Sequence, residues 1–180
     1  LTTRLEAART RTQQMIDTRA ILPAASCIKA DHYQGQLGDF LDRVVQYWSV
    51  KGVLYPMPFN ISNPVFLYNK KAFTQAGLDP NVPPTTLDQI MADAQKLKSS
   101  GAVTKAGYGL KTDPWYLEQW LAKAGDPYVN NSNGRQARAT KTQFNNAAGS
   151  QIFSWISQMT SSGLAVVNND LTNPFDNLLG

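Results

Sequence analysis

Reactive and metal-binding side chains are scarce in this sequence of 180 residues. It contains one cysteine, Cys27, and one histidine, His32. A single cysteine excludes an internal disulfide, and these two residues supply too few ligands for a typical zinc site. Free cysteine usually packs as a small, buried, apolar side chain. We therefore expect structural roles for Cys27 and His32, and we expect neither a metal site nor a cofactor.

Long apolar runs are also missing. No stretch approaches the roughly 20 consecutive apolar residues that a membrane-spanning helix needs. The opening residues, Leu1-Thr-Thr-Arg4, are not followed by the apolar stretch of a secretory leader. From the residues alone, the segment is expected either to begin inside a mature protein or to be cytosolic.

Charge is sparse and dispersed. Charged residues make up 17% of the sequence and hydrophobic residues 42%, which is typical of a globular protein. The net charge is +4, but the basic residues do not gather among aromatic residues as they do in many nucleic-acid-binding proteins. We therefore expect no nucleic-acid partner.

Catalytic signatures are equally scarce. The sequence has no Gly-x-Ser-x-Gly motif, no phosphate-binding glycine loop, no His-Glu-x-x-His motif and no second histidine for a triad. Asp39 and Asp42 share a predicted helix face, but their polar surroundings indicate solvated carboxylates. The sequence therefore predicts a protein that is not an enzyme.

Helices and strands are expected to alternate, which predicts the α/β class. Apolar residues recur at helical spacing, and the predicted helices are Leu1–Gln14, 39–51, 85–100, 114–124 and 142–162. Their predicted N-caps include Asp39, the capping box Thr85-x-x-Asp88, and Asp113 before a proline. Val65–Tyr68 and Tyr108–Leu110 are predicted strands, the first of them buried, and the prolines at 56 and 58 restrict 53–60 to an edge or crossing strand.

Trp115 is the first candidate for a binding residue. In the helix that begins at Pro114, the apolar stripe includes Trp120 and Leu121, whereas Trp115 falls on the opposite side with Glu118. An aromatic ring beside free backbone N–H groups and a carboxylate suits a sugar or polyol. The alternative is that another part of the protein simply packs over Trp115. Trp120 and Trp155 lie on apolar stripes, where packing roles are expected.

The loop from Asn60 to Asn63 is the second candidate. Asn60, Ser62 and Asn63 offer two amides and a hydroxyl between two apolar segments, so they could bind the hydroxyl groups of a solute. Asparagine and serine are also common turn residues, and a purely structural turn is the alternative.

One long stretch resembles a known family. The segment Pro58-Phe-Asn-Ile-Ser-Asn-Pro-Val-Phe-Leu-Tyr-Asn69, followed by Ala76-Gly-Leu-Asp-Pro80 and Pro83-Pro-Thr-Thr86, resembles extracellular solute-binding proteins of bacterial ABC importers for carbohydrates. Within that family it is most similar to the branch that binds sugars, glycerol-3-phosphate or glycerophosphodiesters. The resemblance extends from Gly52 to Gly125.

This resemblance implies two α/β lobes of the periplasmic-binding-protein type, of which the chain is expected to contain only a part. Residues 1–58 would belong to the N-terminal lobe, 59–68 to the crossing or hinge region, and 69–180 to the C-terminal lobe. In such proteins the loop matching Asn60–Asn63 and the aromatic residue matching Trp115 lie near the binding cleft.

The resemblance also implies a function. The protein would capture a sugar or polyol-type solute by lobe closure and deliver it to ABC permease subunits, in the periplasm or on the outer face of the cell membrane. Membrane contact would come only through a tether or the permease. A carbohydrate-active hydrolase, or its accessory binding module, is the alternative from a different class, and a ligand-sensing domain is a third possibility because one fold can serve several functions.

Overall fold

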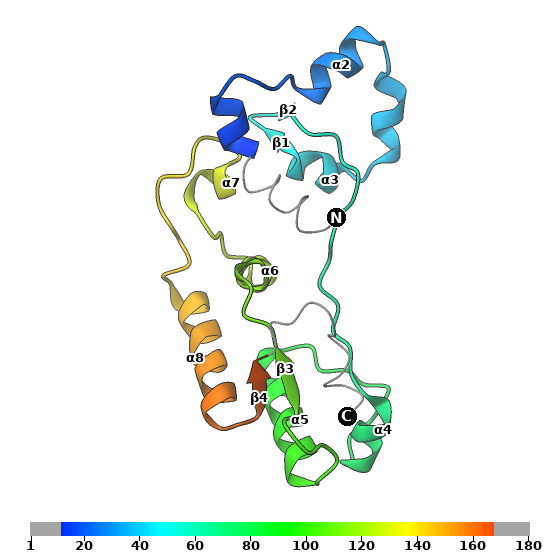
Figure 1. The fold of residues 1–180 in the computed structure, drawn as a ribbon, viewed down its shortest axis with the longest axis vertical. Helices are drawn as coiled ribbons and strands as arrows, with labels where there is room; N and C mark the ends of the chain where they lie inside the picture. Colours follow the sequence, from blue (N-terminus) through cyan, green and yellow to red (C-terminus); the bar gives the residue numbers. More distant parts are fainter. Residues whose placement is uncertain (1–11, 168–180) are drawn as a thin grey trace. The chain divides into compact units, whose positions relative to one another are not determined.

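The structure is a computed structural model that describes residues 12–167. The described chain divides into two compact units. Unit 1 contains the described residues up to Asn63 together with Pro127–Gln143, and unit 2 contains Pro64–Asp126 together with the described residues from Phe144 onward. The ribbon in Figure 1 labels the elements of both units.

Unit 1 consists of short elements. A helical stretch covers 12–17, and the predicted helix over Leu1–Gln14 otherwise lies outside the described residues. Its elements are α2 (Ala24–Ala30), the 3-10 helix η1 (Gln34–Asp39), α3 (Asp42–Tyr47), β1 (Ser49–Val50), β2 (Val53–Leu54) and the left-handed turn α7 (Asn130–Gly134). The antiparallel strands β1 and β2 form a hairpin around Lys51 and Gly52. Both turn residues have positive φ, 52° and 76°, as a tight hairpin turn requires.

The helix predicted to start at Asp39 begins later. Asp39 ends η1, and α3 starts at Asp42 with Leu41 as its N-cap. Leu41 provides no capping side chain, so the predicted capping role of Asp39 is wrong. The 3-10 turn closes before the α-helix begins because the chain is extended at Phe40, with φ −90° and ψ 142°.

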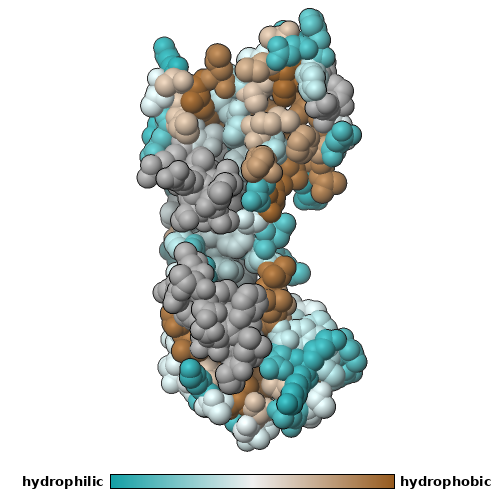
Figure 2. All heavy atoms as spheres, turned by 45° about the vertical axis from the view of Figure 1, so that its right-hand side comes forward, coloured by the Kyte–Doolittle hydropathy of each residue, from teal (hydrophilic) through white to brown (hydrophobic). Residues whose placement is uncertain are grey.

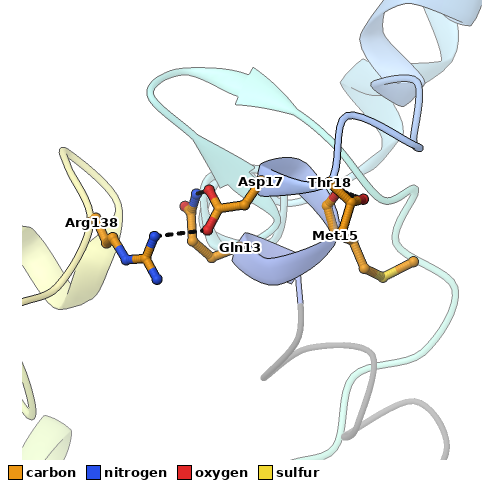
Figure 3. Close-up of polar contacts among 5 residues, drawn as sticks. All are labelled: Gln13, Met15, Asp17, Thr18 and Arg138. Atoms are coloured by element: carbon orange, nitrogen blue, oxygen red, sulfur yellow. Dashed lines mark hydrogen bonds and ion pairs between the residues drawn. The ribbon is translucent and has the colours of Figure 1, made fainter.

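An ion pair links two distant segments within unit 1. The Arg138 guanidinium lies 3.0 Å from Asp17 Oδ2, and Gln13 Nε2 donates to Oδ1 of the same carboxylate at 2.8 Å. Figure 3 draws these residues as sticks. Both ion-pair side chains are exposed, 72% and 40%, so the pair contributes little to stability.

Unit 2 contains the larger helices and a short parallel sheet. Its elements are α4 (Lys70–Gln75), α5 (Leu87–Ser99), β3 (Tyr108–Leu110), α6 (Pro114–Ala124), α8 (Ala147–Ser161) and β4 (Ala165–Val167). The strands β3 and β4 are parallel and pair Tyr108 with Ala165 and Leu110 with Val167. The strand predicted at Tyr108–Leu110 is therefore confirmed, and its partner β4 is an additional finding.

Helix starts in unit 2 differ from the prediction at two helices. The helix predicted over 142–162 begins only at Ala147, where Asn146 is the N-cap. Asn69 accepts from the backbone N–H groups of Lys71 and Ala72 and caps α4. The N-cap of α5 is Thr86, which accepts from Gln89 N at 3.2 Å, rather than the predicted Thr85. Thr85 instead donates through its backbone N–H to Gln89 Oε1 at 2.7 Å.

Two hydrophobic clusters stabilise unit 2. The first surrounds the fully buried side chains of Leu110 and Met159 and includes Ala94, Trp155 and Ala165, with Trp120 and Tyr108 packed against it. The second contains Ala72, Phe73, Ala76 and Leu97. The packing roles predicted for Trp120 and Trp155 are confirmed.

Val65–Tyr68 does not form the predicted buried strand. The backbone from 55 to 69 is irregular, and Val65 and Leu67 are 75% and 51% exposed. A run of apolar residues favours a strand only when a neighbouring strand pairs with it, and the described residues provide none there. Phe66 stacks between Tyr68 and Tyr108, with ring centroids at 6.3 and 6.1 Å.

Candidate functional site

Helix α6 holds Trp115 in its first turn. Asp113 is the N-cap and its side chain accepts from Trp115 N at 2.9 Å, while Pro114 occupies a position where a backbone donor is not needed. Gly125 ends the helix in the left-handed conformation, with φ 81°. Both predicted ends of this helix are confirmed, so the position of Trp115 follows directly from the capping residues.

The indole of Trp115 lies outside the buried stripe of its helix. Leu121 is fully buried, whereas Trp115 is half-buried and packs edge-on against Tyr116 at 5.2 Å between ring centroids. The Trp115 Nε1 atom is buried and has no hydrogen-bond partner in the described part of the chain. A desolvated N–H without an acceptor is unfavourable, and Trp48 Nε1 in unit 1 is in the same state.

Charged and aromatic groups surround the start of α6. Glu118 lies one turn after Trp115 and is half-buried, which places the two residues on neighbouring parts of one helix face. Lys111 Nζ lies 5.9 Å from the centroid of the Tyr116 ring. Neither Lys111 nor Tyr116 was predicted from the sequence, although the dipeptide Trp115-Tyr116 at a helix start was a visible signal.

Tyr108, on β3, packs against the first hydrophobic cluster of unit 2. Its ring packs edge-on against Trp155 at 5.6 Å. Burial, with a smaller contribution from Tyr116, raises the pKa of Tyr108 from 10.0 to about 12. Tyr108 is therefore a neutral phenol under ordinary conditions.

The Asn60–Asn63 loop lies in unit 1. Its backbone has no regular structure; Asn60 and Asn63 are exposed and Ser62 is half-buried. The loop therefore presents its amides at the surface, as the sequence predicts for a polar loop. The structure places Asn60, Ser62 and Asn63 together in one unit and Trp115 and Glu118 together in the other.

The cysteine and the histidine of this chain both lie at the surface. Cys27 is exposed, so its predicted burial is wrong: it lies on α2, which has no buried residue. His32 is also exposed and has a φ of 56°. Among residues 12–167, no three His, Cys, Asp or Glu side chains gather in a way that could hold a metal ion. None of the helices described is both long and apolar enough to cross a membrane.

Sequence comparison identifies relatives. Residues 23–174 match the family model described as "Bacterial extracellular solute-binding protein". The chain is 33% identical over 146 residues to the sn-glycerol-3-phosphate-binding periplasmic protein UgpB of Brucella abortus, covering 80% of this chain and 34% of that protein. It is 34% identical over 155 residues to the protein of the same name from Escherichia coli K12, with 84% and 35% covered. The chain thus spans about a third of the length of these relatives.

Two solved structures are similar in fold. One is the cyclic alpha-maltosyl-1,6-maltose binding protein of Arthrobacter globiformis, with a TM-score of 0.62 and 23% identity over 98% of this chain and 46% of that one. The other is the GacH receptor of Streptomyces glaucescens, with a TM-score of 0.52 and 19% identity over 78% of this chain and 33% of that one. These similarities confirm the predicted α/β fold of the periplasmic-binding-protein type.

The family match covers most of the chain, and two curated relatives share a third of the aligned residues. The resemblance read from the segment that begins at Pro58 is therefore confirmed. This chain belongs to the bacterial extracellular solute-binding protein family.

Proposed function

We propose that the protein to which this chain belongs is the substrate-binding component of an ABC importer. It captures a sugar, a polyol or a glycerophosphodiester and presents it to permease subunits by closure of its lobes. Support comes from the family match over residues 23–174 and from relatives whose names state that they bind sn-glycerol-3-phosphate in the periplasm. The proposed location is the periplasm or the outer face of the cell membrane.

The binding residues form the second part of this proposal. Trp115 stacks on the solute and its indole N–H donates to a ligand oxygen, while Asn60, Ser62 and Asn63 hydrogen-bond to hydroxyl groups. Glu118 accepts from a further hydroxyl. The observation that carries the site is the Trp115 ring, which is half-buried and lies off the stripe of α6 that contains fully buried Leu121. Its Nε1 makes no hydrogen bond in the described part of the chain, so a donation to a ligand would replace no existing bond.

Calorimetric titration of the purified chain with glycerol-3-phosphate, a glycerophosphodiester and maltose tests the proposal. Trp115→Ala is expected to weaken binding by about 1–3 kcal/mol, as aromatic anchors usually do when truncated. Phe153→Ala is the matched control because it removes an aromatic ring of the same unit that is 49% exposed on α8. If both variants lost the same binding free energy, Trp115 would not be part of the binding site. The proposed transport function would be unaffected by that result.

A hydrolase is the competing function, and a turnover assay separates the two. Chromogenic glycosides incubated with the chain should remain intact, because a transport receptor releases its ligand unchanged. Release of the chromophore by the purified chain, abolished by Glu118→Gln, would favour the hydrolase.

A further inference from the structure

The turn α7 has an unusual backbone. Asn131, Ser132 and Asn133 are all left-handed, with φ of 57°, 56° and 55°, and Gly134 follows with φ 78°. Residues with a Cβ rarely adopt this conformation, although asparagine tolerates it better than most. Such a turn persists only where other contacts determine it.

Hydrogen bonds of two asparagine side chains provide those contacts. One asparagine is bonded through its amide oxygen and the other through its amide nitrogen. Asn133 Oδ1 accepts from the backbone N–H groups of Tyr128 at 2.8 Å and Val129 at 3.0 Å. In Asn131 it is the amide nitrogen, Nδ2, that is held, donating to Arg138 O at 2.7 Å. Two residues with nearly the same backbone thus differ in which amide atom is polarised.

This difference is important for a reaction that asparagine undergoes without an enzyme. The backbone nitrogen of the next residue attacks the side-chain carbon Cγ, and negative charge develops on Oδ1. Two N–H groups aimed at Oδ1 stabilise that charge, as donors do in an oxyanion hole. Attack is least hindered when the next residue is glycine, and Asn133-Gly134 is the one Asn-Gly pair in the sequence.

We propose that Asn133 is a site of spontaneous deamidation in the folded chain. Gly134 N loses its proton to hydroxide and forms a bond to Asn133 Cγ, and the Cγ–Nδ2 bond breaks as ammonia leaves, which gives a cyclic imide. Water then opens the ring at Cγ to yield aspartate, or at the backbone carbonyl to yield isoaspartate. The net reaction converts the side-chain amide and one water molecule into a carboxylate and an ammonium ion.

The aspartate product fits the turn. A carboxylate at this position accepts from Tyr128 N and Val129 N as the amide does, and charge strengthens such bonds. Arg135 and Lys141 give the same loop a positive charge that favours the new anion. Isoaspartate inserts an extra backbone carbon and is incompatible with the left-handed turn.

Peptide mapping by mass spectrometry, after incubation of the folded chain at neutral and mildly alkaline pH, tests the proposal. Acid is expected to accumulate at Asn133 before Asn131 and Asn130, and faster at the higher pH. Asn131 is the internal control, because its backbone matches and Ser132 follows it. Equal rates at the two residues, or an intact Asn133 in the folded chain when the urea-unfolded chain is modified there, would overturn the proposal.

Two variants separate chemistry from folding. Gly134→Ala is expected to lower the rate at Asn133 but to keep it above that of Asn131, because Oδ1 still accepts from Tyr128 N and Val129 N. The Asn131 rate in the same sample reports whether the turn is retained. Asn133→Asp is expected to melt no lower than the parent chain. A lower melting temperature would show that the carboxylate does not fit the two N–H groups.

Discussion

At the scale of single residues, two tryptophans of unit 2 have opposite hydrogen-bond states. Trp155 Nε1 donates to Leu87 O at 2.8 Å, whereas Trp115 Nε1 is buried without an acceptor in the described part of the chain. Trp155→Phe should remove this hydrogen bond and shrink a buried side chain, which together cost about 1–3 kcal/mol of unfolding free energy. Trp115→Phe removes a donor that was already unsatisfied, so the unfolding free energy is expected to fall by no more than about 1 kcal/mol.

Urea unfolding of the two phenylalanine variants measures this difference. The measurement uses the ligand-free chain, because a ligand that accepts from Trp115 Nε1 would add to the unfolding free energy of the parent chain. If Trp115→Phe were as destabilising as Trp155→Phe, the indole of Trp115 would be a packing group and its proposed role in binding would be lost.

Tyr108 makes stability depend on alkaline pH. Burial raises the pKa of Tyr108 from 10.0 to about 12. Above pH 10 the phenol ionises in the unfolded chain but not in the folded one, so unfolding releases a proton. Stability therefore falls as pH rises from about 10 to 12, by an amount on the order of 2–3 kcal/mol.

The control for this pH dependence is Tyr108→Phe, which removes the titrating group and keeps the ring against Trp155. The variant should show a flatter decline between pH 10 and 12 than the parent in denaturant unfolding at a series of pH values. Other tyrosines ionise in the same range, so the difference between the two chains is the informative quantity.

At the scale of elements, a close contact joins α5 to the chain that enters β3. A Cβ added to Gly107 would fall against the backbone of Ala94, whereas one added to Gly109, two residues further on, would meet nothing within 4 Å. Gly107→Ala should therefore destabilise the chain by about 1–3 kcal/mol, as overpacking does. Gly109→Ala should change stability by less than about 0.5 kcal/mol. Thermal unfolding of both variants checks this, and equal effects would contradict the helix–strand contact.

Capping residues explain how much of unit 2 is predictable from sequence. Asp113 and Gly125 define both ends of α6, because the chemistry that begins and ends a helix is local. The side of α6 that carries Trp115 follows from helical periodicity for the same reason. Periodicity cannot show that Trp115 Nε1 is buried without an acceptor, since that depends on residues distant in sequence.

Elements that depend on distant partners are the ones that local sequence patterns failed to predict. Val65–Tyr68 has strand composition, but within residues 12–167 no strand pairs with it. β4 was not predicted, although it pairs with β3 across more than fifty residues. The asparagines of α7 indicate a loop, but its left-handed backbone depends on contacts that local patterns do not show, among them those of Asn131 with Arg138 and of Asn133 with Tyr128 and Val129.

At the scale of the whole molecule, buried apolar side chains are unevenly distributed between the units. Among the described residues of unit 1, the buried hydrophobic side chains are Trp48 and Leu54, whereas Leu22, Leu41 and Phe59 are 79%, 77% and 84% exposed. Figure 2 shows hydrophobic side chains, in brown, at the surface of the unit that carries α2 and α3. Unit 2 instead buries two clusters around Met159 and Phe73.

This distribution predicts unequal local stability, because regions with few buried apolar contacts open at lower free energy. Backbone amides of β3 and α8, next to fully buried Leu110 and Met159, should exchange with deuterium slowest. Amides of α2, which has no buried residue, should exchange much faster. Hydrogen exchange followed by mass spectrometry resolves the two regions in one experiment. Equal protection of α2 and α8 would mean that the apolar residues exposed in unit 1 are covered in solution, for example by self-association, and dilution of the sample would then increase exchange in α2 alone.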